Sequence, residues 1–99
     1  MTASARHALE LIRECVEEGR YTLTPHFSRR MDGRGLFWPD VVAVIENPRD
    51  VRSGGLDDGG RPKWLVAGRV SDGLAIEFVC ILDIDENGNT TLFVTIYWD

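Results

Sequence analysis

The sequence predicts one α+β domain in which N-terminal helices pack on one face of an antiparallel sheet. Apolar residues recur at helical spacing in the first half of the chain and alternate with polar residues in the second half. The 99 residues include 43% hydrophobic residues and three tryptophans, which suits one core. We therefore expect a single domain over residues 1–99.

The first helix is expected over residues 4–18. Its apolar stripe includes Leu9 and Ile12, which are spaced to share one helical face. Ser4 can cap the N-terminus of this helix, and Gly19 can end it.

A second helix is expected after the extended link 21–23. Thr24 can accept a hydrogen bond from an unpaired N–H group of the first turn, and Pro25 at the first helical position costs no hydrogen bond. The helix is expected to end near Gly33 or Gly35.

The third helix begins at residues 38–40 and ends at Asn47-Pro48, because a residue before proline avoids the helical region. From residue 49 onward the period changes to two, which indicates strands. The strands are expected at residues 49–52, 63–70, 74–82 and 90–98, with a hairpin connection at 85–89.

Strict alternation in the last strand predicts two faces. One is expected to carry Leu92, Val94, Ile96 and Trp98. The other is expected to carry Thr91, Phe93, Thr95 and Tyr97.

Charge is distributed unevenly along the chain. The formal net charge is −5, yet residues 26–69 carry eight basic and six acidic side chains. A net-acidic chain repels a polyanion at long range, so nucleic-acid binding would need a local basic patch in this middle segment. No run of residues has the length and apolarity of a membrane span or signal peptide. We therefore expect a cytoplasmic protein without a membrane partner, with Cys15 and Cys80 as buried thiols rather than a disulfide.

The strongest functional signal lies on the second helix. His26 and Arg30 fall four residues apart on one face, and Arg34 follows in line. Imidazole and guanidinium groups beside an apolar stripe predict a site for an anion or a phosphate. The spacing of cysteine and histidine matches no metal site, so we expect neither a metal nor another cofactor.

Four segments of the chain resemble the DUF4258 family of small bacterial proteins: 23–35, 48–52, 60–64 and 93–97. The likeness runs from about Tyr21 to Trp98. That family in turn resembles the RelE/ParE-like toxins of toxin–antitoxin systems. The resemblance implies N-terminal helices packed on one face of a curved antiparallel sheet of about four strands, together with metal-independent cleavage of RNA. Possible partners would be RNA or the ribosome and an antitoxin protein. Two departures are the acidic net charge and the absence of a basic tail after Trp98.

The resemblance also implies the site residues. His26, Lys63 and Tyr97 would be catalytic, with His26 as base or acid and Tyr97 as a proton donor or a stacking surface. The resemblance implies that Arg30, Arg61 and Thr95 bind RNA or an anion. Arg34 is added to this set because of its place in line on the second helix.

Each of these residues also has a structural interpretation. His26 can be a packed residue, Lys63 can be solvated, and Tyr97 can be half-buried sheet packing. Arg30 and Arg34 can pair with nearby acids. Two hypotheses follow: a toxin-like endoribonuclease, or a non-catalytic interaction module that binds a peptide or forms a homodimer. A small-molecule phosphate binder ranks last, because no glycine-rich phosphate loop precedes a helix.

Overall fold

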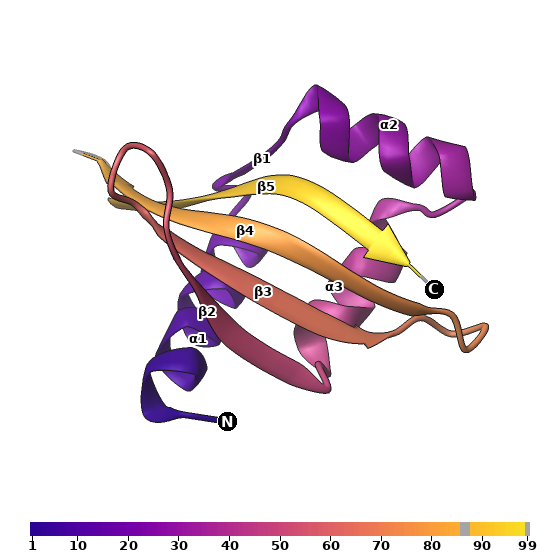
Figure 1. The fold of residues 1–99 in the computed structure, drawn as a ribbon, viewed down its shortest axis with the longest axis horizontal. Helices are drawn as coiled ribbons and strands as arrows, with labels where there is room; N and C mark the ends of the chain where they lie inside the picture. The colour runs from indigo at the N-terminus through magenta and orange to yellow at the C-terminus, as the bar shows by residue number, and fades with distance from the viewer. Residues whose placement is uncertain (86–87, 99) are drawn as a thin grey trace.

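Three helices and five strands form the fold in the computed structural model, which describes residues 1–85 and 88–98 (Figure 1). The elements in chain order are α1 (Ala3–Glu17), β1 (Tyr21–Leu23), α2 (Pro25–Arg34), α3 (Trp38–Glu46), β2 (Asp50–Leu56), β3 (Pro62–Arg69), β4 (Ala75–Asp85) and β5 (Gly88–Trp98). The α+β class is confirmed. The middle of the predicted 85–89 hairpin, residues 86 and 87, lies outside the described residues.

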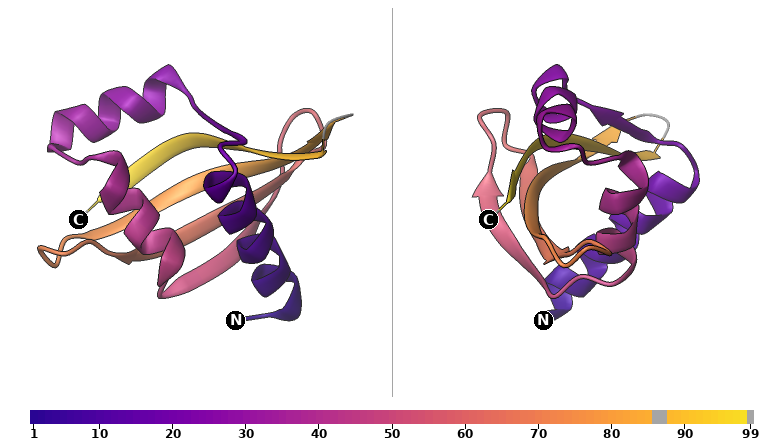
Figure 2. Two further views of the ribbon diagram at one scale, coloured as in Figure 1. Left: turned by 180° about the vertical axis from the view of Figure 1, so that it is seen from behind. Right: turned by 90° about the vertical axis from the view of Figure 1, so that its right-hand side faces the viewer.

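The strands form one sheet in the order β1-β5-β4-β3-β2. Helices α1 and α3 lie on one face, and the sheet curves around them (Figure 2). Helix α2 lies beside β5, and the opposite face of the sheet is turned toward the viewer in Figure 1. We call this opposite face the open face. None of the described helices is long and apolar enough to cross a membrane.

The expected antiparallel sheet of about four strands is corrected to a mixed sheet of five. Residues 21–23, expected as a link, form β1 and pair in parallel with β5, from Tyr21 opposite Thr91 to Leu23 opposite Phe93. A three-residue strand is too short to show a period of two, so the sequence pattern could not reveal it.

Hydroxyl caps begin the first two helices. Thr24 Oγ1 accepts from Phe27 N at 3.1 Å, as expected. Thr2 rather than Ser4 caps α1, because Thr2 Oγ1 accepts from Ala5 N at 3.0 Å. The predicted first helix is therefore right in kind, but its N-terminus lies one residue earlier, at Ala3.

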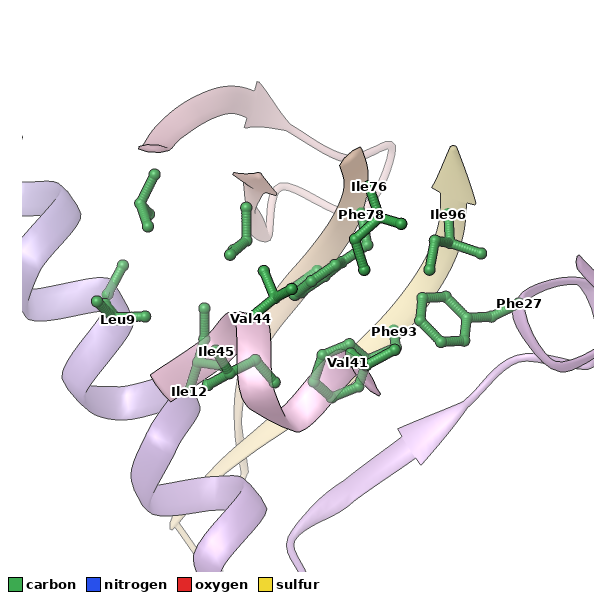
Figure 3. Packing of buried hydrophobic residues seen from close by; sticks show 14 of the residues in the cluster. Leu9, Ile12, Phe27, Val41, Val44, Ile45, Ile76, Phe78, Phe93 and Ile96 are labelled. Atoms are coloured by element: carbon green, nitrogen blue, oxygen red, sulfur yellow. The ribbon is translucent and has the colours of Figure 1, made fainter. Parts of the chain in front are cut away.

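The core lies between the sheet and helices α1 and α3 (Figure 3). Its fully buried side chains include Ile12 of α1, Val44 of α3 and Phe78 of β4. Phe27 joins them from α2, with its ring centroid 5.7 Å from that of Phe93. Cys15 and Cys80 are buried free thiols, as predicted.

A bulge in β5 corrects the predicted faces of the last strand. Val79 pairs with Thr95 but Cys80 pairs with Phe93, so Val94 is an extra residue in β5. The alternation therefore shifts at Val94, and both Phe93 and Ile96 are buried in the core instead of lying on opposite faces. The same shift places Thr95 on the open face of the sheet.

Candidate functional site

Beyond the end of β1, Thr24 and helix α2 form the hydrogen bonds to the edge of β5. Thr24 N donates to the carbonyl oxygen of Phe93 at 3.0 Å. Thr24 Oγ1, which caps α2, also donates to the carbonyl oxygen of Val94 at 2.8 Å. Six residues after Thr24, Arg30 Nε donates to the carbonyl oxygen of Ile96 at 2.6 Å. These bonds satisfy carbonyl groups that an edge strand would otherwise leave unpaired, and they fix α2 against the sheet.

His26 lies in the first turn of α2 and is exposed to solvent. Its Nε2 lies 3.0 Å from Thr95 Oγ1 of β5. Because a hydroxyl can both donate and accept, this contact suits either tautomer of the imidazole. The contact orients the ring, and within residues 1–85 and 88–98 no group forms a hydrogen bond with its other nitrogen.

Arg30 lies over the two aromatic rings at the end of β5. The guanidinium carbon is 4.8 Å from the centroid of the Trp98 ring and 5.4 Å from that of Tyr97. Such geometry stabilises the cation through the ring quadrupoles. Arginine has five N–H donors, and the bond to Ile96 uses only one of them. The remaining donors can bind an anion.

We call His26, Arg30, Thr95 and Tyr97 the edge cluster. Its members come from α2 and β5, and Tyr97 is 49% exposed. The edge cluster therefore combines an imidazole, a guanidinium, a hydroxyl and a phenol on one solvent-open edge of the sheet. These groups can bind a phosphate and exchange protons with it.

Lys63 lies apart from the edge cluster. Lys63 pairs with Ile81 of β4. Tyr97 pairs with Glu77, which lies four residues before Ile81 on β4. At about 3.3 Å per residue, these two rows are about 13 Å apart along the sheet. The structure therefore does not bring Lys63 and Tyr97, both expected to be catalytic, together in one site.

Arg61 is held by two carboxylates at the far end of the sheet. Its Nε lies 2.8 Å from Asp57 Oδ2, and its Nη1 lies 3.3 Å from Asp83 Oδ2. The pKa of Asp57 is lowered, first by a hydrogen bond from the Arg61 backbone N–H and then by the guanidinium. The hydrogen bond to Asp57 in turn raises the pKa of Arg61. Arg61 is therefore engaged in an ion-pair network and lies outside the edge cluster.

Arg34, the last residue of α2, also lies away from the edge cluster. It borders a separate hollow beside Asp40 and Asp72 and is exposed. The expected line of His26, Arg30 and Arg34 thus divides: its first two members reach β5, and the third does not.

One charged group was missed by the sequence analysis. Arg52 of β2 contacts Asp50 Oδ2 at 3.0 Å and also contacts Glu77 Oε1 of β4. Glu77 pairs directly with Tyr97 in the sheet, so the group lies beside the edge cluster on the open face. The alternation of apolar and polar residues in β4 places Glu77 on the sheet face that points away from the core. This alternation was the sequence signal that could have identified Glu77.

Comparison with known proteins places these elements in a family. Residues 23–98 match the family described as "Domain of unknown function (DUF4258)". No curated protein and no solved structure matches the chain. The matched segment runs from β1 to β5 and contains every member of the edge cluster. The chain therefore belongs to the DUF4258 family.

Proposed function

We propose that this protein is a toxin-like, metal-independent endoribonuclease whose reaction takes place at the edge cluster. In this proposal the protein is related to the RelE/ParE-like toxins, acts in the cytoplasm, and is controlled by an antitoxin protein. The observation that carries the proposal is the convergence of His26, Arg30 and Tyr97 on one exposed edge.

The proposed reaction is attack by a ribose 2′-hydroxyl on the adjacent phosphorus. His26 removes the proton from the 2′-oxygen, and Thr95 orients the imidazole ring. The free N–H groups of Arg30 stabilise the additional negative charge of the phosphorane. Tyr97 donates its phenolic proton to the departing 5′-oxygen. The products are a 2′,3′-cyclic phosphate and a 5′-hydroxyl end.

Inducible expression in bacteria tests this proposal. We expect the full chain to arrest growth, and we expect His26→Ala or Tyr97→Phe to relieve the arrest. His7→Ala is the matched control, because His7 is an exposed histidine of α1, and it should arrest growth like the unmodified chain. Normal growth with folded, soluble, unmodified protein would contradict the proposal.

A non-catalytic interaction module is the second candidate. The specific observation in its favour is that three arginines each contact two carboxylates: Arg20, Arg52 and Arg61. These contacts reduce the positive charge available to RNA on a chain with a net charge of −5. A module of this kind would bind a protein partner or a second copy without arresting growth.

A further inference from the structure

A cavity of about 410 Å³ opens on the open face directly beside the edge cluster. Tyr97 belongs to both, so the cavity adjoins the edge cluster. Its lining also includes Arg49, Asp50, Ala67, Ala75 and Glu77. Binding sites for small ligands commonly have volumes of a few hundred Å³.

The register of the sheet explains why this region is hollow. Asp50, Ala67, Glu77 and Tyr97 form one row across β2, β3, β4 and β5, because each pairs with the next. The methyl group of Ala67 leaves a gap between longer side chains in this row. Ala75, one row further on the same face, also has a short side chain, so the space extends over it. The result is a shallow space over Ala67 and Ala75, with the carboxylates of Asp50 and Glu77 on its two sides and the phenol ring of Tyr97 beyond Glu77.

The charges of this space suit a ligand that donates hydrogen bonds. Arg52 contacts both Asp50 and Glu77, so one guanidinium serves two carboxylates. The contact of Arg52 with Glu77 involves Oε1. A carboxylate offers about four lone-pair sites, so Glu77 can still accept hydrogen bonds from a ligand. Arg49, which also lines the cavity, supplies N–H donors of its own.

We propose that this cavity binds a guanine base of an RNA strand, an inference that rests on the proposed ribonuclease function. Guanine presents two adjacent donors, N1–H and the N2 amino group, and two adjacent acceptors, O6 and N7. Glu77 accepts from the donor pair, and Arg49 donates to the acceptor pair. The base packs against the ring of Tyr97, as unstacked RNA bases do on aromatic side chains. Adenine, cytosine and uracil each lack the paired donors.

The position of the cavity fits the position of the reacting phosphate. Thr95, which contacts His26, lies two residues before Tyr97 on β5, or about 7 Å at the usual rise of a strand. This separation is similar to that between the phosphate and the base of one nucleotide. A guanosine whose base stacks on Tyr97 at this end of the cavity therefore places its phosphate near His26 and Arg30.

Binding of the four nucleoside 3′-monophosphates to the full chain tests this inference. Tryptophan fluorescence is a suitable signal, because Trp98 contributes to the cavity lining. We expect 3′-GMP to bind at least about tenfold more tightly than 3′-AMP, 3′-CMP or 3′-UMP, in keeping with one bidentate base contact. Glu77→Gln should abolish this preference, because an amide offers one acceptor where guanine needs two.

Two further variants complete the design. Glu10→Gln removes an exposed carboxylate of α1 outside the cavity, and it should keep the guanine preference. Ala67→Leu fills the cavity, and it should weaken binding of 3′-GMP. This variant keeps Glu77, so it tests the site independently if Glu77→Gln disturbs Arg52. Equal binding of all four nucleotides, an unchanged preference in Glu77→Gln, or unchanged binding of 3′-GMP by Ala67→Leu would overturn the inference.

The outcome is separable from the proposed function. Cleavage of RNA without any guanine preference would overturn the guanine site and leave the ribonuclease proposal intact. Selective binding of 3′-GMP without cleavage of any RNA would support the guanine site and contradict the ribonuclease proposal.

Discussion

Arg30 donates its Nε hydrogen to the carbonyl oxygen of Ile96, which makes a helical side chain the hydrogen-bonding partner of a strand edge. Parallel pairing with β1 ends at Phe93, and Thr24 and Arg30 continue the bonding beyond it. The same bond holds the guanidinium over the rings of Tyr97 and Trp98. Arg30 thus has a structural role in docking α2, and its unused donors belong to the proposed site.

Replacement of Arg30 by Lys should lower the free energy of unfolding by about 1–3 kcal/mol. An ammonium group cannot both donate to the Ile96 carbonyl and stack as a planar group on Trp98. Urea denaturation of the purified protein measures the change. Arg29→Lys is the control, because Arg29 is exposed on the same helix, and it should change stability by less than about 0.5 kcal/mol. Equal effects of the two variants would contradict the docking role.

The helices and the long strands were predictable because their signals are local. Thr24-Pro25 marks the start of α2 by capping chemistry, and the left-handed φ of 75° at Gly35 ends that helix as glycine usually does. The alternation in β4 placed Phe78 and Cys80 together on the buried face. Each of these signals depends on neighbours within a few residues.

The parts that were missed depend on pairing between distant segments. The parallel register of β1 with β5 and the extra residue at Val94 are set by contacts across the sheet, so no local period indicates them. The grouping of Lys63 with Tyr97 was wrong for the same reason, since two residues on one face of the sheet can still lie about 13 Å apart along it. The contact between His26 and Thr95 agrees with the sequence-based expectation that both belong to one site, but the role of that site stays a prediction.

Gly68 packs directly against Val44 of α3. A Cβ atom at residue 68 would lie 2.9 Å from Val44 Cγ1, which is too close for an unstrained contact. Gly68→Ala should therefore destabilise the protein by about 1–3 kcal/mol through overpacking. Combined with Val44→Ala it should cost less than the sum of the two single changes, with a coupling of at least about 0.5 kcal/mol. Strict additivity in a double-mutant cycle would contradict the contact.

Thr91 is a buried polar residue within the core. Among the described residues, none forms a hydrogen bond with its Oγ1. Thr91→Val replaces the hydroxyl by a methyl group of similar size, so stability should stay unchanged or rise by about 1 kcal/mol. Thermal unfolding followed by circular dichroism measures this. A loss of more than about 1 kcal/mol would show that the hydroxyl has a partner.

Asp57 should make stability depend on pH. Its pKa is lowered in the folded protein below the value of about 3.9 expected for an unfolded chain. A carboxyl group of this kind stabilises the fold above the unfolded pKa, and the contribution is lost as pH falls through the folded pKa. Asp57→Asn should therefore lower the urea midpoint at pH 7, and the difference from the unmodified protein should shrink at pH 3. Asp58→Asn, the exposed neighbour, should behave like the unmodified protein at both pH values. A difference that is the same at pH 7 and pH 3 would contradict the ion pair with Arg61.

The most direct test of the central claim is cleavage of a defined single-stranded RNA by the purified full chain in the presence of EDTA. We expect fragments that end in a 2′,3′-cyclic phosphate, and a rate at least about 100-fold lower for His26→Ala, since loss of a general base commonly costs this much. His7→Ala should cleave at the unmodified rate. An unchanged rate in folded His26→Ala, or no cleavage by the unmodified protein, would contradict the claim that the edge cluster is a ribonuclease site.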